Sequence, residues 1–94
     1  KTRRSNDYRA PNAIRMYNLY VHGVECGLCE YAASELIKSV EGVVSVAYCK
    51  GVHGYDDGFF IVEWDVSKGD ISFESLQDCL RKDDFYIDIM HRKI

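Results

Sequence analysis

The 94-residue chain lacks several features that would assign it to large classes of proteins. No apolar run approaches the ~18 residues that a membrane-spanning helix needs, and no hydrophobic region of a signal peptide is present. The chain has no low-complexity segment, and it is too short for two domains that each bury a core. Its hydrophobic content of 47 % predicts one packed globular domain.

Positive charge is scarce outside the N-terminal segment. Residues 1–15 carry five basic groups and one acidic group, so their net charge is +4; because the whole chain carries −3, the remainder carries −7. We therefore expect a basic, flexible arm at 1–15 and a single domain at 16–94. The acidic domain argues against nucleic acid as the main partner, since binding to a duplex needs a basic face.

The first residue bears on location. The chain begins at Lys1, as would a piece of a larger protein or the remainder of a processed precursor. The sequence leaves the location open between the cytoplasm and, if Lys1 follows a removed signal peptide, the periplasm.

Hydrophobic periodicity predicts six elements in the order β-α-β-β-α-β. The period of two predicts strands at 16–22, 43–49, 58–64 and 85–90, and the period of 3.6 predicts helices at 28–40 and 70–80. Gly42 is expected to end the first helix, and Ser72 to cap the second. The stretch 50–58, rich in glycine and aspartate, is expected to be the turn of a hairpin between the second and third strands.

This element order predicts an α+β fold of the ferredoxin-like βαββαβ type. With right-handed crossovers, each βαβ unit leaves room for a strand between its parallel pair. The result is a four-stranded antiparallel sheet of order 4-1-3-2 with both helices on one face. The side chains in phase with the core include these: Tyr17, Leu19, Val21, Cys29, Val40, Val44, Val46, Tyr48, Phe60, Val62, Trp64, Phe73, Leu76, Cys79, Leu80, Ile87 and Ile89.

Two cysteines form a C-x-x-C motif at the junction of the first strand and first helix. Cys26 is expected in the exposed turn and Cys29 in the first helical turn, where unpaired backbone N–H groups favour thiolate over thiol. Two thiolates at this spacing can chelate one soft ion, and a two-sulfur set suits Cu(I) or Hg(II). Zn(II) needs a tetrahedral set and hence more ligands.

The segment from about Tyr17 to Ile89 resembles a heavy-metal-associated domain. That family includes copper chaperones, N-terminal modules of metal-pumping P-type ATPases, and mercury-scavenging periplasmic proteins. Its hallmark Gly-Met-Thr-Cys-x-x-Cys corresponds here to "GVECGLC" at 23–29, and "EYAASELIKSVEGVVSV" and "VEWD" resemble its first helix, second strand and third strand.

The resemblance implies that Cys26 and Cys29 are metal ligands and that the chain is not an enzyme. It implies a heavy-metal ion as cargo, with Cu(I) favoured and Zn(II), Cd(II) or Hg(II) as alternatives. It also implies a metal-transporting ATPase or another metal-acceptor protein as partner, with no membrane span in this chain. The expected state is a monomer or a weak metal-bridged dimer.

Several departures from the family pattern bear on which metal is bound. Glu25 replaces threonine and is a candidate oxygen ligand that would shift the preference toward Zn(II) or Cd(II). Val24 replaces a methionine that packs beneath the loop, and Asp84 replaces a glycine before the last strand. The long hairpin adds Cys49 and His53, a candidate auxiliary ligand pair or second weak site, although about 10 Å must be bridged from the second strand.

Other readings of the same residues stay open. Cys26 and Cys29 also suit a thiol-disulfide redox or redox-sensing domain, and a third possibility is a docking module whose thiols are incidental. Cys79 is expected to be a core residue and His22 a surface residue.

Overall fold

The computed structural model describes residues 14–69 and 71–93. The elements run in the following order: β1 (Ile14–His22), α1 (Gly27–Lys38), β2 (Val43–Gly51), β3 (Gly54–Asp65), a short 3₁₀ helix η2 (Val66–Lys68), α2 (Phe73–Arg81) and β4 (Tyr86–Lys93). No helix in these two ranges is long and apolar enough to cross a membrane.

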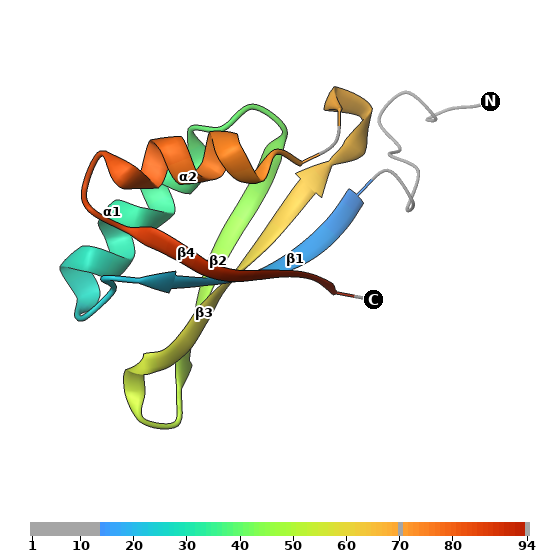
Figure 1. Ribbon diagram of the computed structural model, residues 1–94. Coiled ribbons are helices and arrows are strands. Elements are labelled where there is room, and N and C mark those ends of the chain that lie inside the picture. The colour runs from blue at the N-terminus through green and yellow to red at the C-terminus, as the bar shows by residue number, and fades with distance from the viewer. Residues whose placement is uncertain (1–13, 70, 94) are drawn as a thin grey trace.

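The four strands form one antiparallel sheet of order β2-β3-β1-β4. Both helices cover the same face of the sheet, and neither α1 nor α2 lies on the opposite face (Figure 1). This is the ferredoxin-like arrangement that the sequence predicts, including the strand order. The predicted cap of α2 is confirmed as well, because the Ser72 hydroxyl accepts a hydrogen bond from the Ser75 N–H at 3.1 Å.

The core lies between the sheet and the two helices. Its members are buried aliphatic and aromatic side chains from β1, α1, β3, α2 and the connecting segments, as follows: Leu19, Val24, Ala33, Ile37, Val40, Phe60, Val62, Trp64, Leu76, Leu80 and Phe85. Most of these fall at positions in phase with the predicted faces. The strict alternation of Phe60, Val62 and Trp64 is confirmed in full, since each of the three is at most 3 % exposed.

The prediction of which β4 side chains face the core is wrong after Ile87. Ile87 packs against the core, but Ile89 is 47 % exposed and Met90 takes the inward position instead. The cause is a bulge: Val21 pairs with Ile87 and Tyr20 with Ile89, so one extra residue of β4 lies between the two pairs. Because side chains alternate with a period of two, one inserted residue reverses the faces of everything after it.

Two further predicted core positions are exposed. Val44 is 47 % exposed because the pairing of β2 with β3 shifts between Val43 and Ser45, which turns Val44 outward. Phe73 is 43 % exposed because it is the first residue of α2, one turn before the buried Leu76.

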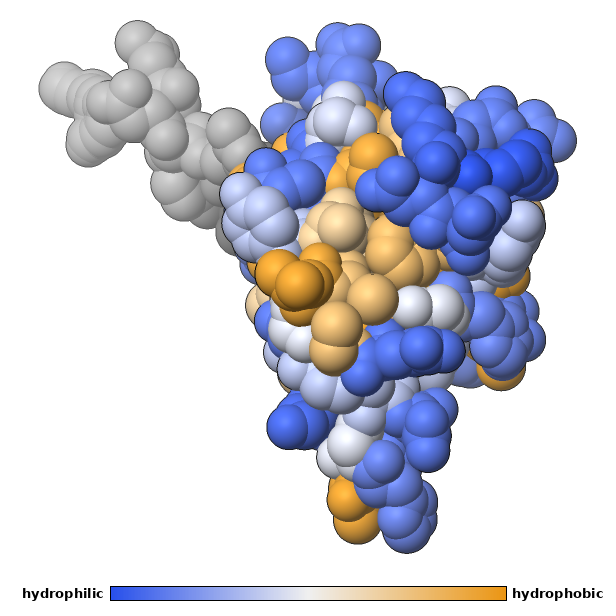
Figure 2. Space-filling model, turned by 90° about the vertical axis from the view of Figure 1, so that its left-hand side faces the viewer, coloured by the Kyte–Doolittle hydropathy of each residue, from blue (hydrophilic) through white to orange (hydrophobic). Residues whose placement is uncertain are grey.

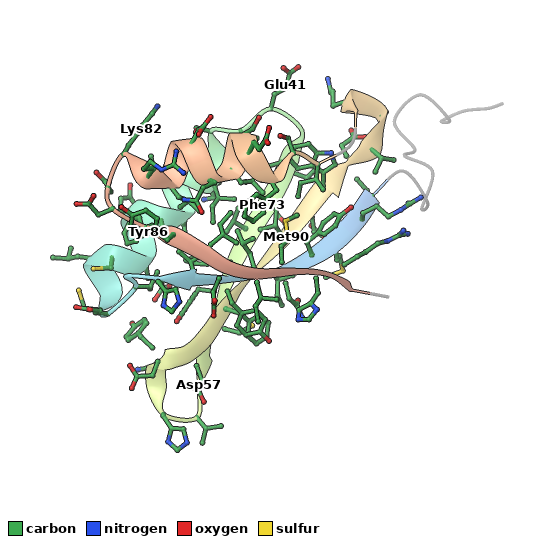
Figure 3. All side chains as sticks on the ribbon, viewed as in Figure 1. Glu41, Asp57, Phe73, Lys82, Tyr86 and Met90 are labelled. Atoms are coloured by element: carbon green, nitrogen blue, oxygen red, sulfur yellow. The ribbon has the colours of Figure 1, made fainter. Side chains whose placement is uncertain are left out.

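The hairpin between β2 and β3 is longer and more regular than the predicted turn at 50–58. Only Val52 and His53 separate the two strands, and Gly51 pairs with Gly54. The paired arms extend beyond the helical layer, and Asp57 lies on this projecting part of the hairpin (Figure 3). Residues expected in a loop therefore have strand positions, with side chains on fixed faces of the sheet.

The first strand begins earlier than the predicted strand at 16–22. β1 begins at Ile14, which pairs with Asp65, so the strand takes in the last two residues of the expected arm. The rest of that arm, residues 1–13, lies outside the described residues.

A buried amide joins α2 to the start of β4. Gln77 is only 8 % exposed; its Nε2 donates to the Phe85 carbonyl at 3.1 Å, and its Oε1 accepts from the Ile87 N–H at 2.8 Å. The Phe85 carbonyl lies just before the edge strand β4, and the Ile87 N–H lies near the start of that strand. The Gln77 side chain therefore supplies hydrogen-bond partners that a neighbouring strand does not. The sequence does not predict this role for Gln77.

Candidate metal centre

The turn between β1 and α1 holds Cys26 and Cys29 side by side. Cys26 is the extended N-cap residue of α1, and Cys29 lies in its first turn. Their sulfur atoms are 3.7 Å apart, and all four cysteines of the chain are free thiols. The structure therefore brings the two predicted ligands together at a distance that one metal ion can bridge.

Packing beneath the turn fixes its path. Gly23 has φ +104°, and a Cβ there would lie 3.0 Å from the ring of Phe85, so the tight entry to the loop depends on glycine. Val24 is 5 % exposed and lies in the core below the thiols. This agrees with a shape-conserving role for valine at the position of the family's methionine.

The start of α1 favours the thiolate form of Cys26. Its pKa is lowered chiefly by the backbone N–H of Cys29, next by that of Leu28, and then by the Cys29 thiol. Desolvation, and after it the charge of Glu25, oppose these effects and raise the pKa. The balance is a lowered pKa, as expected for a thiol at a helix N-terminus.

The thiols lie at an exposed end of the domain. Cys26 is exposed, Cys29 is half-buried, and Leu28 between them is 81 % exposed. Figure 2 faces the end of the molecule where β1 passes into α1 and shows an apolar area bordered by hydrophilic surface. A second protein can therefore approach this turn without displacing part of the domain.

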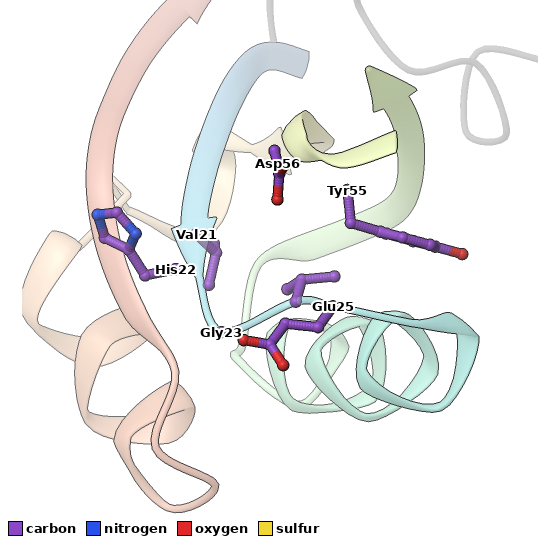
Figure 4. A pocket seen from close by; sticks show the side chains of 7 residues that line it. Val21, His22, Gly23, Glu25, Tyr55 and Asp56 are labelled. Carbon is purple, nitrogen blue, oxygen red and sulfur yellow. The ribbon is translucent and has the colours of Figure 1, made fainter. Parts of the chain in front are cut away.

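A cavity of about 160 Å³ separates the turn from the hairpin. Its lining residues come from the end of β1, the turn and β3, and they are Val21, His22, Gly23, Val24, Glu25, Tyr55 and Asp56 (Figure 4). These segments are distant in the sequence, and the fold brings them together at one end of the sheet. The two carboxylates in this lining give the surroundings of the thiols a negative charge.

The hairpin contributes Tyr55, which the sequence predicts to lie in a turn. The Tyr55 hydroxyl donates to Oε1 of Glu30 in the first turn of α1 at 3.3 Å. Its ring stacks on Tyr48, with centroids 5.4 Å apart and planes at 19°, and Lys50 Nζ lies 5.1 Å from its centroid. Burial first, and then the charge of Glu30, raise the pKa of Tyr55, so the hydroxyl stays a donor at neutral pH.

The candidate auxiliary ligands do not complete a larger ligand group. Cys49 is half-buried on β2; because its neighbour Tyr48 packs in the core, alternation turns Cys49 toward the face of the sheet opposite the two helices. His53 is exposed in the hairpin turn, where its N–H donates to Asp57 Oδ1 at 3.1 Å. Within residues 14–69 and 71–93, no three or more His, Cys, Asp or Glu side chains are grouped to hold a metal ion.

The remaining candidates have local roles. His22 is exposed, as predicted, and its Nε2 lies 3.6 Å from Oδ1 of Asp88 in a pair whose side chains are 70 % and 53 % exposed. Such a pair contributes little to stability. Cys79 packs against the core, also as predicted, and accepts from the Ser39 hydroxyl at 3.8 Å.

Fold and site together define a ferredoxin-like domain with an exposed dithiol turn at the start of its first helix. No protein-family model matches the chain, and no curated protein matches it in sequence. Solved structures do share its fold. One is a CopZ metallochaperone, with a TM-score of 0.60 and 22 % identity over 78 % of this chain and 98 % of that one.

Two further structures are similar to the same extent. A proposed copper-ion-binding protein from Bacillus anthracis str. Ames has a TM-score of 0.63 and 22 % identity, over 82 % of this chain and 99 % of that one. Oxidized MerP from Ralstonia metallidurans CH34 has a TM-score of 0.62 and 22 % identity, over 87 % of this chain and 100 % of that one. These likenesses confirm the fold that the resemblance implies.

Proposed function

We propose that the chain is a heavy-metal-associated module that binds one metal ion between Cys26 and Cys29 and passes it to an acceptor protein. The observation that carries the proposal is the pair of thiols 3.7 Å apart at an exposed helix start. The lowered pKa of Cys26 adds support, because the thiolate is the form that binds metal. The fold shared with a CopZ metallochaperone is consistent with it.

The proposed cargo is a soft ion. Two thiolates without a third close ligand suit Cu(I) best, and Hg(II) accepts the same near-linear arrangement. Zn(II) or Cd(II) would need further ligands, and Glu25 beside Cys26 is the candidate oxygen donor for them. Binding releases protons from both thiols, so affinity falls at acidic pH.

Transfer to an acceptor needs only ligand exchange. A thiolate of the acceptor adds to the ion to give a three-coordinate intermediate, and one of the two original sulfurs then leaves. No group on the chain has to donate or abstract a proton in this exchange, so the proposed role is carriage and not catalysis. The exposed turn at Leu28 lets both proteins reach the ion at once.

The proposed partner is a metal-transporting ATPase or another metal acceptor with a basic docking face. The residues after position 15 carry a net charge of −7, and Glu25 and Asp56 add carboxylates beside the turn. Opposite charges steer such partners together, and salt weakens the attraction. The proposed state is a monomer that a shared ion can bridge weakly to a second copy.

Metal titration of the reduced protein tests the proposal. We expect one Cu(I) or Hg(II) per chain, with loss of tight binding in Cys26→Ser and in Cys29→Ser. The matched controls are Cys79→Ser, which alters a thiol in the core, and the double variant Cys49→Ser/His53→Ala. Both controls should keep the stoichiometry and affinity; binding that survives the loss of Cys26 and Cys29 would contradict the proposal.

The spacing of the thiols also favours a second candidate function. Sulfur atoms 3.7 Å apart can form a disulfide after a small movement, so the pair also suits thiol-disulfide exchange or redox sensing. A reduction potential near the cellular poise, with no tight metal binding, would support this alternative.

A further inference from the structure

Glu30 occupies the position from which a third ligand could join the thiol pair. It follows Cys26 by four residues, and its N–H donates to the Cys26 carbonyl at 2.9 Å. Cys26 is the N-cap of α1, and Cys29 and Glu30 lie in its first turn, so all three side chains project from the start of one helix. A carboxylate here is a natural oxygen donor to an ion that the sulfurs hold.

The carboxylate of Glu30 is instead bonded to the hairpin. The Tyr55 hydroxyl donates to its Oε1 at 3.3 Å. Tyr55 itself is fixed by its stack on Tyr48 and by the Lys50 ammonium group near its ring. In the part of the chain that the structure describes, no third His, Cys, Asp or Glu side chain is grouped with the two cysteines.

Tyr48 is in turn held by strands of the sheet. Its ring centroid lies 4.7 Å from that of Phe60, a fully buried core residue. Its hydroxyl lies over Gly58, where any Cβ would clash with it. The position of Tyr55 therefore follows from the core and from strand pairing, which makes it a rigid point of attachment for Glu30.

We infer that Tyr55 is a specificity-determining residue, which holds Glu30 away from Cys26 and Cys29 and so keeps the site a two-sulfur site. The inference rests on the proposed function and extends it to the choice of ion. Two sulfurs suit Cu(I), whereas two sulfurs with one carboxylate oxygen suit the divalent ions Cd(II) and Zn(II) better. Tyr55 thus selects against divalent ions by occupying the ligand that they need.

Removing one hydroxyl group tests this inference. Tyr55→Phe keeps the ring and its stack but loses the bond to Glu30. We measure the dissociation constants of Cd(II) and of Cu(I) with the reduced protein, each against a competing chelator, and record the X-ray absorption of the Cd(II) complex. We expect Cd(II) to bind about tenfold more tightly than to the parent, with an added oxygen neighbour, and Cu(I) affinity to change by less than about twofold.

Glu30→Gln supplies the matched comparison. Alone it should leave both affinities near those of the parent, because the carboxylate is already held away. Combined with Tyr55→Phe it should abolish the gain in Cd(II) affinity. Asp56→Asn in the Tyr55→Phe protein controls for charge: the gain should persist, because Asp56 lines the same cavity but is not the released ligand.

The outcomes separate this inference from the proposed function. If the parent binds Cu(I) at the cysteines but Tyr55→Phe leaves the ratio of Cd(II) to Cu(I) affinity unchanged, the inference is wrong and the proposed function stands. A gain that survives Glu30→Gln, or one that Asp56→Asn removes, also overturns it. If the parent binds neither ion at the cysteines, the proposed function fails.

Discussion

The hydroxyl group of Tyr48 on β2 lies over the backbone of Gly58 on β3, at a point where any side chain on Gly58 would collide with it. This close approach sets the tilt of the Tyr48 ring, which packs on Phe60 and on Tyr55. Glycine is normally unfavourable inside a strand. Here it leaves room for the Tyr48 ring, which joins the hairpin to the core.

Substituting Gly58 should therefore destabilise the domain. Gly58→Ala forces the Tyr48 ring or the strand to move, which we expect to lower the free energy of unfolding by about 1–3 kcal/mol. Chemical denaturation measures it. Gly27→Ala is the control, because a Cβ there meets open space at the start of α1; it should leave stability unchanged or raise it by up to about 1 kcal/mol. Equal effects of the two variants would contradict the account.

Loss of the Gln77 amide should also be costly. Gln77→Leu leaves the Phe85 carbonyl and the Ile87 N–H without their partner, and we expect a loss of about 2–4 kcal/mol in unfolding free energy. Hydrogen exchange should show the Ile87 amide losing protection. The neighbouring Asp78→Ala breaks only an exposed pair with Arg81 and should change stability by less than about 0.5 kcal/mol. A Gln77→Leu protein as stable as the parent would rule out the bridging role.

Asp84 should gain from replacement by glycine. It has φ +63°, the left-handed region that costs an L-residue energy, and it occupies the position where the resembling family has glycine. We expect Asp84→Gly to raise the free energy of unfolding by up to about 1 kcal/mol, and the melting temperature with it. Asp83→Gly, at a negative φ, should instead lower the free energy of unfolding. The opposite order of the two variants would show that backbone conformation is not the deciding factor.

The pKa of Cys26 predicts how its reactivity depends on pH. In the metal-free, reduced protein, the alkylation rate of Cys26 should rise with pH through an inflection below that of an ordinary thiol, because backbone N–H groups stabilise the thiolate. Glu25 raises this pKa, so Glu25→Gln should move the inflection to still lower pH. Mass spectrometry resolves the rate at each cysteine; an unchanged or higher inflection in Glu25→Gln would contradict the assigned electrostatics.

The arrangement of elements was predictable because strong local patterns specify it. Alternation at Phe60, Val62 and Trp64 and the helical spacing that leads to Ile37 and Val40 survive in the structure unchanged. The order of strands then follows from handedness alone. The position of Cys26 and Cys29 at the start of α1 follows in the same way.

What could not be predicted depends on contacts between strands. The bulge that turns Ile89 outward and the shift that exposes Val44 arise from the register between neighbouring strands. That register cannot be predicted from the sequence of either strand alone. The glycines and aspartates around Tyr55 predict a turn, and its bond to Glu30 joins residues 25 positions apart in the sequence. The sequence does show that Glu30 follows Cys26 by four residues. That spacing is the one sign in the sequence that Glu30 lies close to the thiol pair.

X-ray absorption of the protein loaded with one Cu(I) per chain tests the central claim most directly. The account predicts an ion with two sulfur neighbours, a spectrum that is the same in the double variant Cys49→Ser/His53→Ala, and loss of that two-sulfur shell in Cys26→Ser. A nitrogen or oxygen shell in place of one sulfur, or a spectrum unaffected by Cys26→Ser, would contradict it.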